Sequence, residues 1–330
     1  MATDGGVFEG KKVLVTGGLG FIGSNLAIRL VGLGAEVLLV DSLIPEYGGH
    51  LFNISPVREK VRVNISDVRD EHSMRYLVQG EDVLFNLAGQ TSHLDSMTDP
   101  YTDLEINARA QLSILECCRK YNPDIKIVFA STRQIYGKPE YLPVKESHPL
   151  RPVDVNGINK MAGESYHLLY HTVYGIRSCV LRLTNTYGPR MRIKDARQTF
   201  LGVWIRQLME KKPFEVWDGT QLRDFTYVDD AVDALLMTAG SDHVGGEVFN
   251  LGGDCVMNLK DLADLLIEIH GGGEYVLRSF PPNRRQIDIG NYYADFSRIR
   301  DALNWRPAIS LREGLTRTLR FYREHLSRYV

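Results

Sequence analysis

The sequence predicts an α/β protein, in which a doubly wound parallel Rossmann sheet is joined to a smaller C-terminal substrate-binding lobe. Short apolar runs alternate with helical patterns through roughly the first 180 residues, which indicates a parallel sheet covered by helices on both faces. A glycine-rich turn directly follows the first apolar run. The chain has 330 residues, more than a single domain of ordinary size contains. We therefore expect one large domain or two interleaved ones.

Each strand of the predicted sheet is a short apolar run, as in parallel strands that are buried on both faces. Strands are expected at 12–16, 36–40, 61–65, 82–86, 125–130 and 177–183. The helix expected at 21–33 has apolar residues at helical spacing and stops before Gly34, which suits the C-terminal end of a helix. Further helices are expected at 103–121 and around Lys160.

The second half has a different texture, which begins after Asn185 with a turn signal at 187–190. Helices are expected at 199–211, 229–239, 259–269 and 311–326, and a strand at 247–251. We assign residues 1–185, together with about 215–240, to the Rossmann domain. Residues 186–214 and 241–330 are assigned to the substrate-binding lobe. Because no Gly/Ser-rich linker separates the two parts, we expect them to pack on each other without a hinge of that type.

Charge and composition exclude several classes of protein. The net charge is −2 and no dense basic run is present, so no nucleic-acid partner is expected. No apolar stretch approaches the ~20 residues of a membrane span, and the N-terminus has no apolar signal region. The four cysteines form no CxxC pair, which favours neither a metal site nor a redox motif and is typical of small core residues in a reduced protein. We expect a cytoplasmic protein that binds neither membranes nor metal.

The turn after the first strand has the glycine spacing of a dinucleotide-binding motif. Gly17, Gly20 and Gly23 give G-x-x-G-x-x-G, a spacing variant of the Rossmann fingerprint. Gly17 allows the sharp turn, Gly20 lets the backbone approach a pyrophosphate, and Gly23 lets helix and strand pack closely. The helix then opens with Phe21 and Ile22, where unpaired N–H groups and the positive end of the dipole favour phosphate.

Asp41 favours NAD over NADP as the cofactor. It ends the second strand about 20 residues after the glycines, as the fingerprint requires. A carboxylate there accepts hydrogen bonds from the ribose hydroxyls and repels a 2′-phosphate, and Ser42 and Leu43 follow in place of an arginine. Asp67 and Val68, just past the third strand, are expected beside the adenine.

Several motifs in the right order resemble the extended short-chain dehydrogenase/reductase family, in its branch of NAD-dependent sugar-nucleotide epimerases and dehydratases. The resemblance runs almost from end to end, at 16–23, 86–90, 107, 131–132, 135–137, 157–164, 181–190, 221–230 and 304–307. It implies a bound NAD, a nucleoside-diphosphate sugar as substrate, and a homodimer formed through the helix of Lys160 and the helix before it.

The resemblance also assigns roles to residues through the motif positions they occupy. It places Leu87, Ala88, Gln90 and Lys160 at the nicotinamide ribose, and Asn107 as a support of the active-site helix. It makes Thr132, Asn185, Arg223, Arg285 and Tyr292 substrate-binding residues. Thr132 would hydrogen-bond the sugar O4, and the two arginines would hold the diphosphate, which their fixed paired donors suit.

The pattern breaks at the residue that should move the proton. In the family a tyrosine lies four residues before the lysine, one turn away on the same helix face, and here that position is Asn156. An amide neither takes up nor releases a proton near neutral pH. With Thr132, Asn156 and Lys160 as the expected catalytic set, the replacement could be Lys160 itself, Tyr136, His93, or a water ordered by Asn156 and Thr132.

A second break bears on the reaction type. Dehydratases of the family carry an acid pair just after the Ser/Thr, where this chain has Arg133 and Gln134, which cannot do the work of that pair. We therefore expect NAD-dependent epimerisation through a transient 4-keto intermediate. A 4,6-dehydratase or decarboxylase-like enzyme, and a catalytically impaired NAD and sugar-nucleotide binding protein, remain the alternatives.

Overall fold

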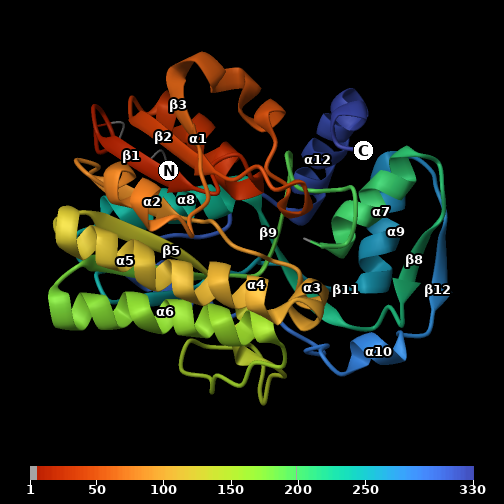
Figure 1. The fold of residues 1–330 in the computed structure, drawn as a ribbon. Helices are drawn as coiled ribbons and strands as arrows, with labels where there is room; N and C mark the ends of the chain where they lie inside the picture. Colours follow the sequence, from red (N-terminus) through yellow and green to blue (C-terminus); the bar gives the residue numbers. More distant parts are fainter. Residues whose placement is uncertain (1–5, 198) are drawn as a thin grey trace.

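The protein, described here in a computed structural model over residues 6–197 and 199–330, is built around one sheet of seven parallel strands (Figure 1). The strand order is β10-β6-β5-β4-β1-β2-β3. The strands are β1 (Lys12–Thr16), β2 (Glu36–Asp41), β3 (Val61–Ile65), β4 (Val83–Asn86), β5 (Lys126–Thr132), β6 (Arg177–Leu183) and β10 (Val248–Asn250). The expected α/β fold with a doubly wound parallel sheet is confirmed.

Helices cover both faces of this sheet. Alternate residues of each strand point to opposite faces, so the apolar side chains of each strand pack on both helix layers. The side chains of Val13 and Val15 in β1 join a core cluster with α1 (Phe21–Gly32) and α8 (Val228–Gly240), whereas Leu14 between them joins the cluster on the other face. The helices of that other face are α2 (Glu71–Leu77), α5 (Ala110–Tyr121) and α6 (Val155–Tyr174). Figure 1 shows α5 and α6 side by side on the outside of the molecule.

The helix expected at 103–121 starts earlier and is not uniform. Asp99 caps α4 (Pro100–Leu104) by accepting a hydrogen bond from the Thr102 N–H at 3.2 Å. A π-helical turn at Glu105–Arg109 then leads into α5. The short helix α3 (His93–Thr98), which is capped by Ser92, lies just before α4 in the chain. Together these elements bring 90–107 against the N-terminal end of α6, where the candidate site lies.

The C-terminal lobe contains two small sheets that the sequence pattern did not predict. One is β11-β9-β7, made of Val256–Asn258, Leu222–Tyr227 and Asn185–Tyr187, and the other is β12-β8, made of Tyr275–Arg278 and Phe214–Trp217. The helices are α7 (Phe200–Met209), α9 (Leu259–His270), α10 (Pro282–Arg285), α11 (Ser297–Leu303) and α12 (Leu311–His325). Each of the four helices expected in the second half is present within one or two residues of its expected ends.

The division into two parts differs from the expectation at β10. This strand pairs with β6 and extends the large sheet, although 241–330 as a whole was assigned to the lobe. Within 215–240, α8 packs on the Rossmann side, while β8 pairs with β12 in the lobe. One cysteine also departs from expectation, since Cys255 is exposed whereas the other three are buried. In the described residues no helix has the length and apolar character that crossing a membrane requires.

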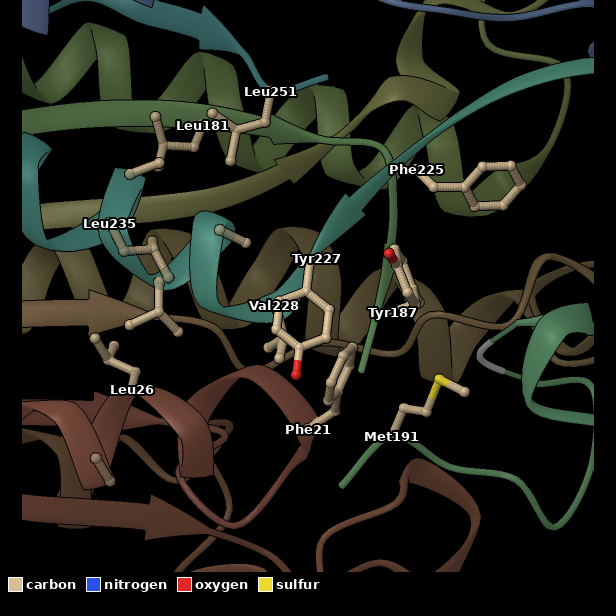
Figure 2. Close-up of a cluster of buried hydrophobic side chains, with 14 of the residues drawn as sticks. Phe21, Leu26, Leu181, Tyr187, Met191, Phe225, Tyr227, Val228, Leu235 and Leu251 are labelled. Atoms are coloured by element: carbon tan, nitrogen blue, oxygen red, sulfur yellow. The ribbon is translucent and has the colours of Figure 1, made fainter. Parts of the chain in front are cut away.

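The two parts share one hydrophobic core, part of which is drawn in Figure 2. There Phe21 of α1 and Val228 of α8 lie close to Tyr227 of β9, and Tyr187 of β7 lies beside them. The rings of Tyr187 and Tyr227 pack edge to face with centroids 5.6 Å apart. Aromatic contacts of this kind add to area burial, so the lobe is fixed to the sheet by a continuous apolar interior.

Candidate active site

A cleft of about 1010 Å³ lies at the carboxyl ends of the central strands, with walls from the large sheet and the C-terminal lobe. Ligand sites of open α/β sheets lie at this end. The expected cofactor residues that line it are Gly17, Gly20, Phe21, Ile22, Gly23, Asp41, Ser42, Asp67, Val68, Leu87, Ala88, Gln90 and Lys160. The other expected residues that line it are Thr132, Asn156, Asn185 and Arg223, whereas Asn107, Arg285 and Tyr292 lie outside its wall.

The glycine turn between β1 and α1 has the shape that a dinucleotide requires. Gly17 has a φ of +67°, and a Cβ built on Gly23 would lie 2.2 Å from the Gly17 carbonyl oxygen. Helix α1 begins at Phe21, its N-cap residue Gly20 provides no side-chain cap, and its first turn has no acidic residue. Its first N–H groups therefore stay available for phosphate oxygens, and the residues present fit the diphosphate of NAD.

The Asp41 carboxylate is held in place by backbone donors at the end of β2. Its Oδ2 accepts from the Leu19 N–H at 3.0 Å, and its Oδ1 accepts from the Leu43 N–H at 2.9 Å. Burial raises the pKa of Asp41, and these two backbone hydrogen bonds lower it in part. A carboxylate has about four lone-pair sites, so it can still accept from two ribose hydroxyls, as the expected preference for NAD requires.

Asp103 is the centre of a buried amide network that the sequence did not predict. Its Oδ2 accepts from Nδ2 of Asn107 and of Asn156, each at 3.0 Å, and its Oδ1 accepts from Asn159 Nδ2 at 2.8 Å. The side chains of Asn107 and Asn156 also donate to the Gln90 carbonyl, at 2.9 and 2.8 Å. Asn107 thus joins its helix to the segment at Gln90, while Asn156 and Asn159 link Asp103 to α6; the supporting role expected for Asn107 stays a prediction.

The network explains what Asn156 does in place of a tyrosine. Its amide N–H groups point toward Gln90 and Asp103 and hold the start of α6 against the 90–107 segment. Asp103 accepts from the amides of Asn107, Asn156 and Asn159, so Asn156 is one of three neutral donors to this buried carboxylate. The one sequence signal for it was the spacing of Asp103 and Asn107, which are neighbours on a helix surface.

Lys160 is almost fully enclosed beside the cofactor turn. Its Nζ donates to the Ala130 carbonyl at 3.2 Å and lies 5.1 Å from the centre of the Phe129 ring. Gly89 makes room for it, since a Cβ built there would lie 2.8 Å from this Nζ. Burial lowers the pKa of Lys160 to about 8, against an opposing effect of the Asp103 charge.

The structure separates the other candidates for proton transfer. The Tyr136 hydroxyl donates to Asn250 Oδ1 and accepts from Arg182 Nη1, both at 2.6 Å, and burial raises its pKa to about 12. Tyr136 is fully buried away from the cleft wall, so it is an unsuitable replacement for the missing tyrosine. His93 lines the cleft, and its Nδ1 lies 3.0 Å from Oδ2 of the buried Asp154.

Asp154 is a second residue that the sequence did not single out. It caps α6 by accepting from the Gly157 N–H at 2.7 Å, and it also accepts from Gln134 Nε2 at 2.7 Å. Burial raises its pKa, but the contacts with His93, Gly157 and Gln134 together outweigh that effect, and the resulting pKa lies below the usual value. Its charged form is therefore favoured next to His93. An N-cap position just before the expected helix was the available signal.

The expected substrate residues are only partly brought together. Arg223 lines the cleft with its Nη1 bonded to the Leu222 and Gly290 carbonyls, and Asn185 Nδ2 donates to the Asp224 carbonyl at 2.9 Å. Tyr292 is fully buried behind the wall. Arg285 is exposed and ion-paired with Asp218 at 3.3 Å.

Arg284, rather than Arg285, lines the cleft, which differs from the expectation. Its guanidinium lies 4.6 Å from the centre of the Trp217 ring, and that ring packs edge to face against Phe280 at 5.8 Å. Trp217 and Phe280 also belong to the wall of the cleft, in the lobe. Sequence reasoning missed this aromatic pair, because its members lie on separate segments that meet only in the fold.

The chain matches the family model described as the NAD dependent epimerase/dehydratase family over residues 13–252. A putative UDP-glucose 4-epimerase of Methanocaldococcus jannaschii is 34% identical over 315 residues, which cover 95% of this chain and 99% of that protein.

Solved structures agree. The UDP-glucose 4-epimerase of Thermotoga maritima, solved with UDP-glucose, has a TM-score of 0.87 and 30% identity, over 96% of this chain and 99% of that one. A dTDP-glucose 4,6-dehydratase of Streptomyces venezuelae, solved with NAD bound, has a TM-score of 0.87 and 25% identity, over 96% and 98% of the two chains. The chain therefore belongs to the NAD-dependent epimerase/dehydratase family, and it is an NAD-dependent enzyme that modifies sugar nucleotides.

Proposed function

We propose that the protein epimerises a nucleoside-diphosphate sugar through a transient 4-keto intermediate, and that His93 moves the proton. The proposal rests on one observation. The Asn156 amide is hydrogen-bonded to Asp103, whereas His93 lines the cleft and lies 3.0 Å from the Asp154 carboxylate. A histidine next to a buried carboxylate is a common acid–base arrangement. When bound at the glycine turn and Asp41, NAD would supply the acceptor and donor of the C4 hydride.

The remaining residues would bind and orient the sugar. Thr132 accepts from the Gln134 N–H at 3.2 Å, which leaves its own hydroxyl hydrogen for the sugar O4. Lys160 would hold the ribose hydroxyls of the cofactor, and Arg223 the diphosphate. His93 would take the proton from the C4 hydroxyl as the C4–H bond breaks, and would return it to O4 after the keto sugar has turned over.

Epimerisation is favoured over dehydration by the residues after Thr132. Loss of water needs an acid at the departing hydroxyl and a base at C5. Arg133 and Gln134, at the positions of the dehydratase acid pair, supply neither. The Gln134 amide is moreover bonded to Asp154 at 2.7 Å, so its role is to hold that carboxylate.

Lys160 is the second candidate for the proton transfer, and its pKa of about 8 supports it. A general base works best with a pKa near the working pH. The role of Lys160 can be tested through the pH dependence of the rate. If Lys160 is the base, the rate of the parent enzyme should rise through pH 8. This rise should disappear in Lys160→Arg, because the arginine stays charged.

The test starts from the purified protein with NAD and UDP-, GDP-, CDP- and dTDP-sugars, with NADH absorbance and NMR of the sugar as readouts. We expect one sugar to be converted to its C4 epimer. His93→Asn should lower NADH formation in single turnover by about 10²–10⁴-fold with NAD affinity retained. A dehydrated or decarboxylated product would overturn epimerisation, and binding without turnover on any sugar would favour a binding protein. Full activity of His93→Asn would overturn the role of His93.

We also propose that the enzyme is a homodimer through α5 and α6. Ile158, Leu169 and Val173 of α6 are 49%, 52% and 58% exposed. Their spacing of eleven and then four residues puts them on one helix face, and Figure 1 shows α6 on the outside of the molecule. An apolar stripe of this kind on a surface helix is typical of a protein interface.

A further inference from the structure

Arg133 lies in the wall of the cleft beside Thr132, and it forms no ion pair with any residue that the structure describes. It follows Thr132 directly, and its side chain lines the cleft. Its Nη1 is shielded from solvent and has no hydrogen-bond partner among the residues that the structure describes. The guanidinium is poorly solvated, and this burial lowers its pKa. A cation in such a place is costly unless an anion joins it.

The charges of two nearby carboxylates, Asp224 and Asp288, raise the pKa of Arg133 in part, but neither forms an ion pair with it among the described residues. Asp288 is paired with Arg223 at 3.5 Å, and Asp224 Oδ2 accepts from the Ala294 N–H at 3.0 Å. Burial raises the pKa of Asp224 to about 6, and its Oδ1 accepts no hydrogen bond among the described residues. Besides its burial, Arg223 has its pKa lowered by the positive charge of Arg133. The two arginines and two aspartates balance in number, but the Arg133 Nη1 is left without a hydrogen-bond partner in the described part of the chain.

The guanidinium is oriented by an aromatic ring and not by an acid. It lies 5.5 Å from the centre of the Tyr292 ring. Tyr292 is fully buried, stacks on Tyr136 with centroids 6.3 Å apart, and pairs through its backbone with Arg223. A planar guanidinium held in this way keeps its paired donors free for a planar carboxylate. The ring thus prepares Arg133 for a ligand.

We propose that Arg133 binds a carboxylate on the sugar, so that the preferred substrates are nucleoside-diphosphate uronic acids. The inference rests on the proposed function, because it places a sugar at Thr132. Lys160 Nζ bonds to the Ala130 carbonyl at 3.2 Å, so the reactive end of the cleft lies within three residues of Arg133 in the chain. The diphosphate, the other anion of such a substrate, is matched to Arg223.

The test compares UDP, UDP-glucose and UDP-glucuronic acid in the presence of NAD, by calorimetric titration of the parent protein, Arg133→Gln and Arg133→Lys. The last two ligands differ only in the carboxylate. In the parent protein we expect UDP-glucuronic acid to bind at least about tenfold more tightly than UDP-glucose, as a charge-assisted pair implies. The preference should vanish in Arg133→Gln and be partly kept in Arg133→Lys. Arg284→Gln removes a guanidinium from another part of the cleft and should keep the parent preference.

Three outcomes would overturn the inference. The first is that the parent protein binds UDP-glucose as tightly as UDP-glucuronic acid or more tightly. The second is that the preference survives in Arg133→Gln. The third is that Arg133→Gln weakens the binding of UDP and of both sugars by one factor, which would assign Arg133 to the diphosphate. In each case sugar nucleotides still bind and the proposed function stands. Failure of all three ligands and of the other nucleotide sugars to bind would overturn both. Melting temperatures with NAD separate a loss of folding from a loss of the contact.

Discussion

The start of α1 rests on a contact that a single methyl group would break. In Gly23→Ala the new Cβ would lie 2.2 Å from the Gly17 carbonyl oxygen and 2.9 Å from Gly18 Cα. A relaxed contact of carbon with a carbonyl oxygen is about 3.3 Å or longer, so helix and turn must separate by roughly 1 Å. Both obstacles are backbone atoms and no side chain can turn aside. Overpacking of this kind costs about 1–3 kcal/mol of stability.

The same displacement should weaken the binding of the cofactor more than it lowers the stability of the fold. A hydrogen bond of ordinary length that opens by roughly 1 Å is lost, and one bond to a charged group contributes about 1.5–3 kcal/mol. We therefore expect the Kd for NAD to rise by about 10–150-fold. Gly32→Ala in the same helix is the matched control, because a Cβ there meets no atom within 4 Å.

Calorimetric titration with NAD and urea unfolding of the three proteins provide the assay. Gly32→Ala should bind NAD like the parent protein and be equally stable or slightly more so, since alanine is the better helix former. An unchanged Kd for NAD in Gly23→Ala would refute the reasoning, because the helix N-terminus would then not be the phosphate site.

Three further changes test the site and the fold. Asn156→Tyr removes an amide donor from the buried Asp103 and inserts a larger ring. The free energy of unfolding should therefore fall by about 1–3 kcal/mol, and NADH formation should drop. A gain in activity would show that this position still works as in the family. Burial lowers the pKa of His167 from 6.5 to about 4; its contribution to stability is complete above pH 6.5 and is lost as the pH falls toward 4, roughly 3 kcal/mol in all. Urea unfolding across that range should therefore show a smaller loss in His167→Gln than in the parent protein, and parallel curves would contradict this. Leu169→Arg puts a charge in the apolar stripe of α6 and should yield a monomer in light scattering, with Thr316→Arg at an exposed position of α12 as the control; a dimer in both variants would exclude this interface.

The large sheet could be predicted from the sequence because its strands are buried on both faces and so appear as continuous apolar runs. A strand at β10 (Val248–Asn250) was predicted from the sequence, but its position at the edge of the large sheet was not. Three residues carry no information on which sheet they join, and their pairing with β6 is decided by the fold. Strands β7 and β11 of the lobe were missed for the same reason, since they also have three residues each.

The cofactor end of the site was predictable, and the sugar end was less so. Residues of the glycine turn lie in the cleft because one short motif fixes their local geometry. By contrast, the choice between Arg284 and Arg285 depends on which way a short helix faces, and adjacent residues on a helix point about 100° apart. Asp103 and Asp154 were missed because their partners lie tens of residues away in the chain.

The interior shared by sheet and lobe limits how this chain can be recombined with its relatives. Tyr187, Phe225 and Tyr227 come from the lobe, yet they belong to the same apolar cluster as Phe21 and Val228. A chimaera that took the lobe from another family member would have to take the matching surface of α1 and α8 with it. Substrate range in such enzymes is therefore best altered by single replacements in the cleft, which leave this joint intact.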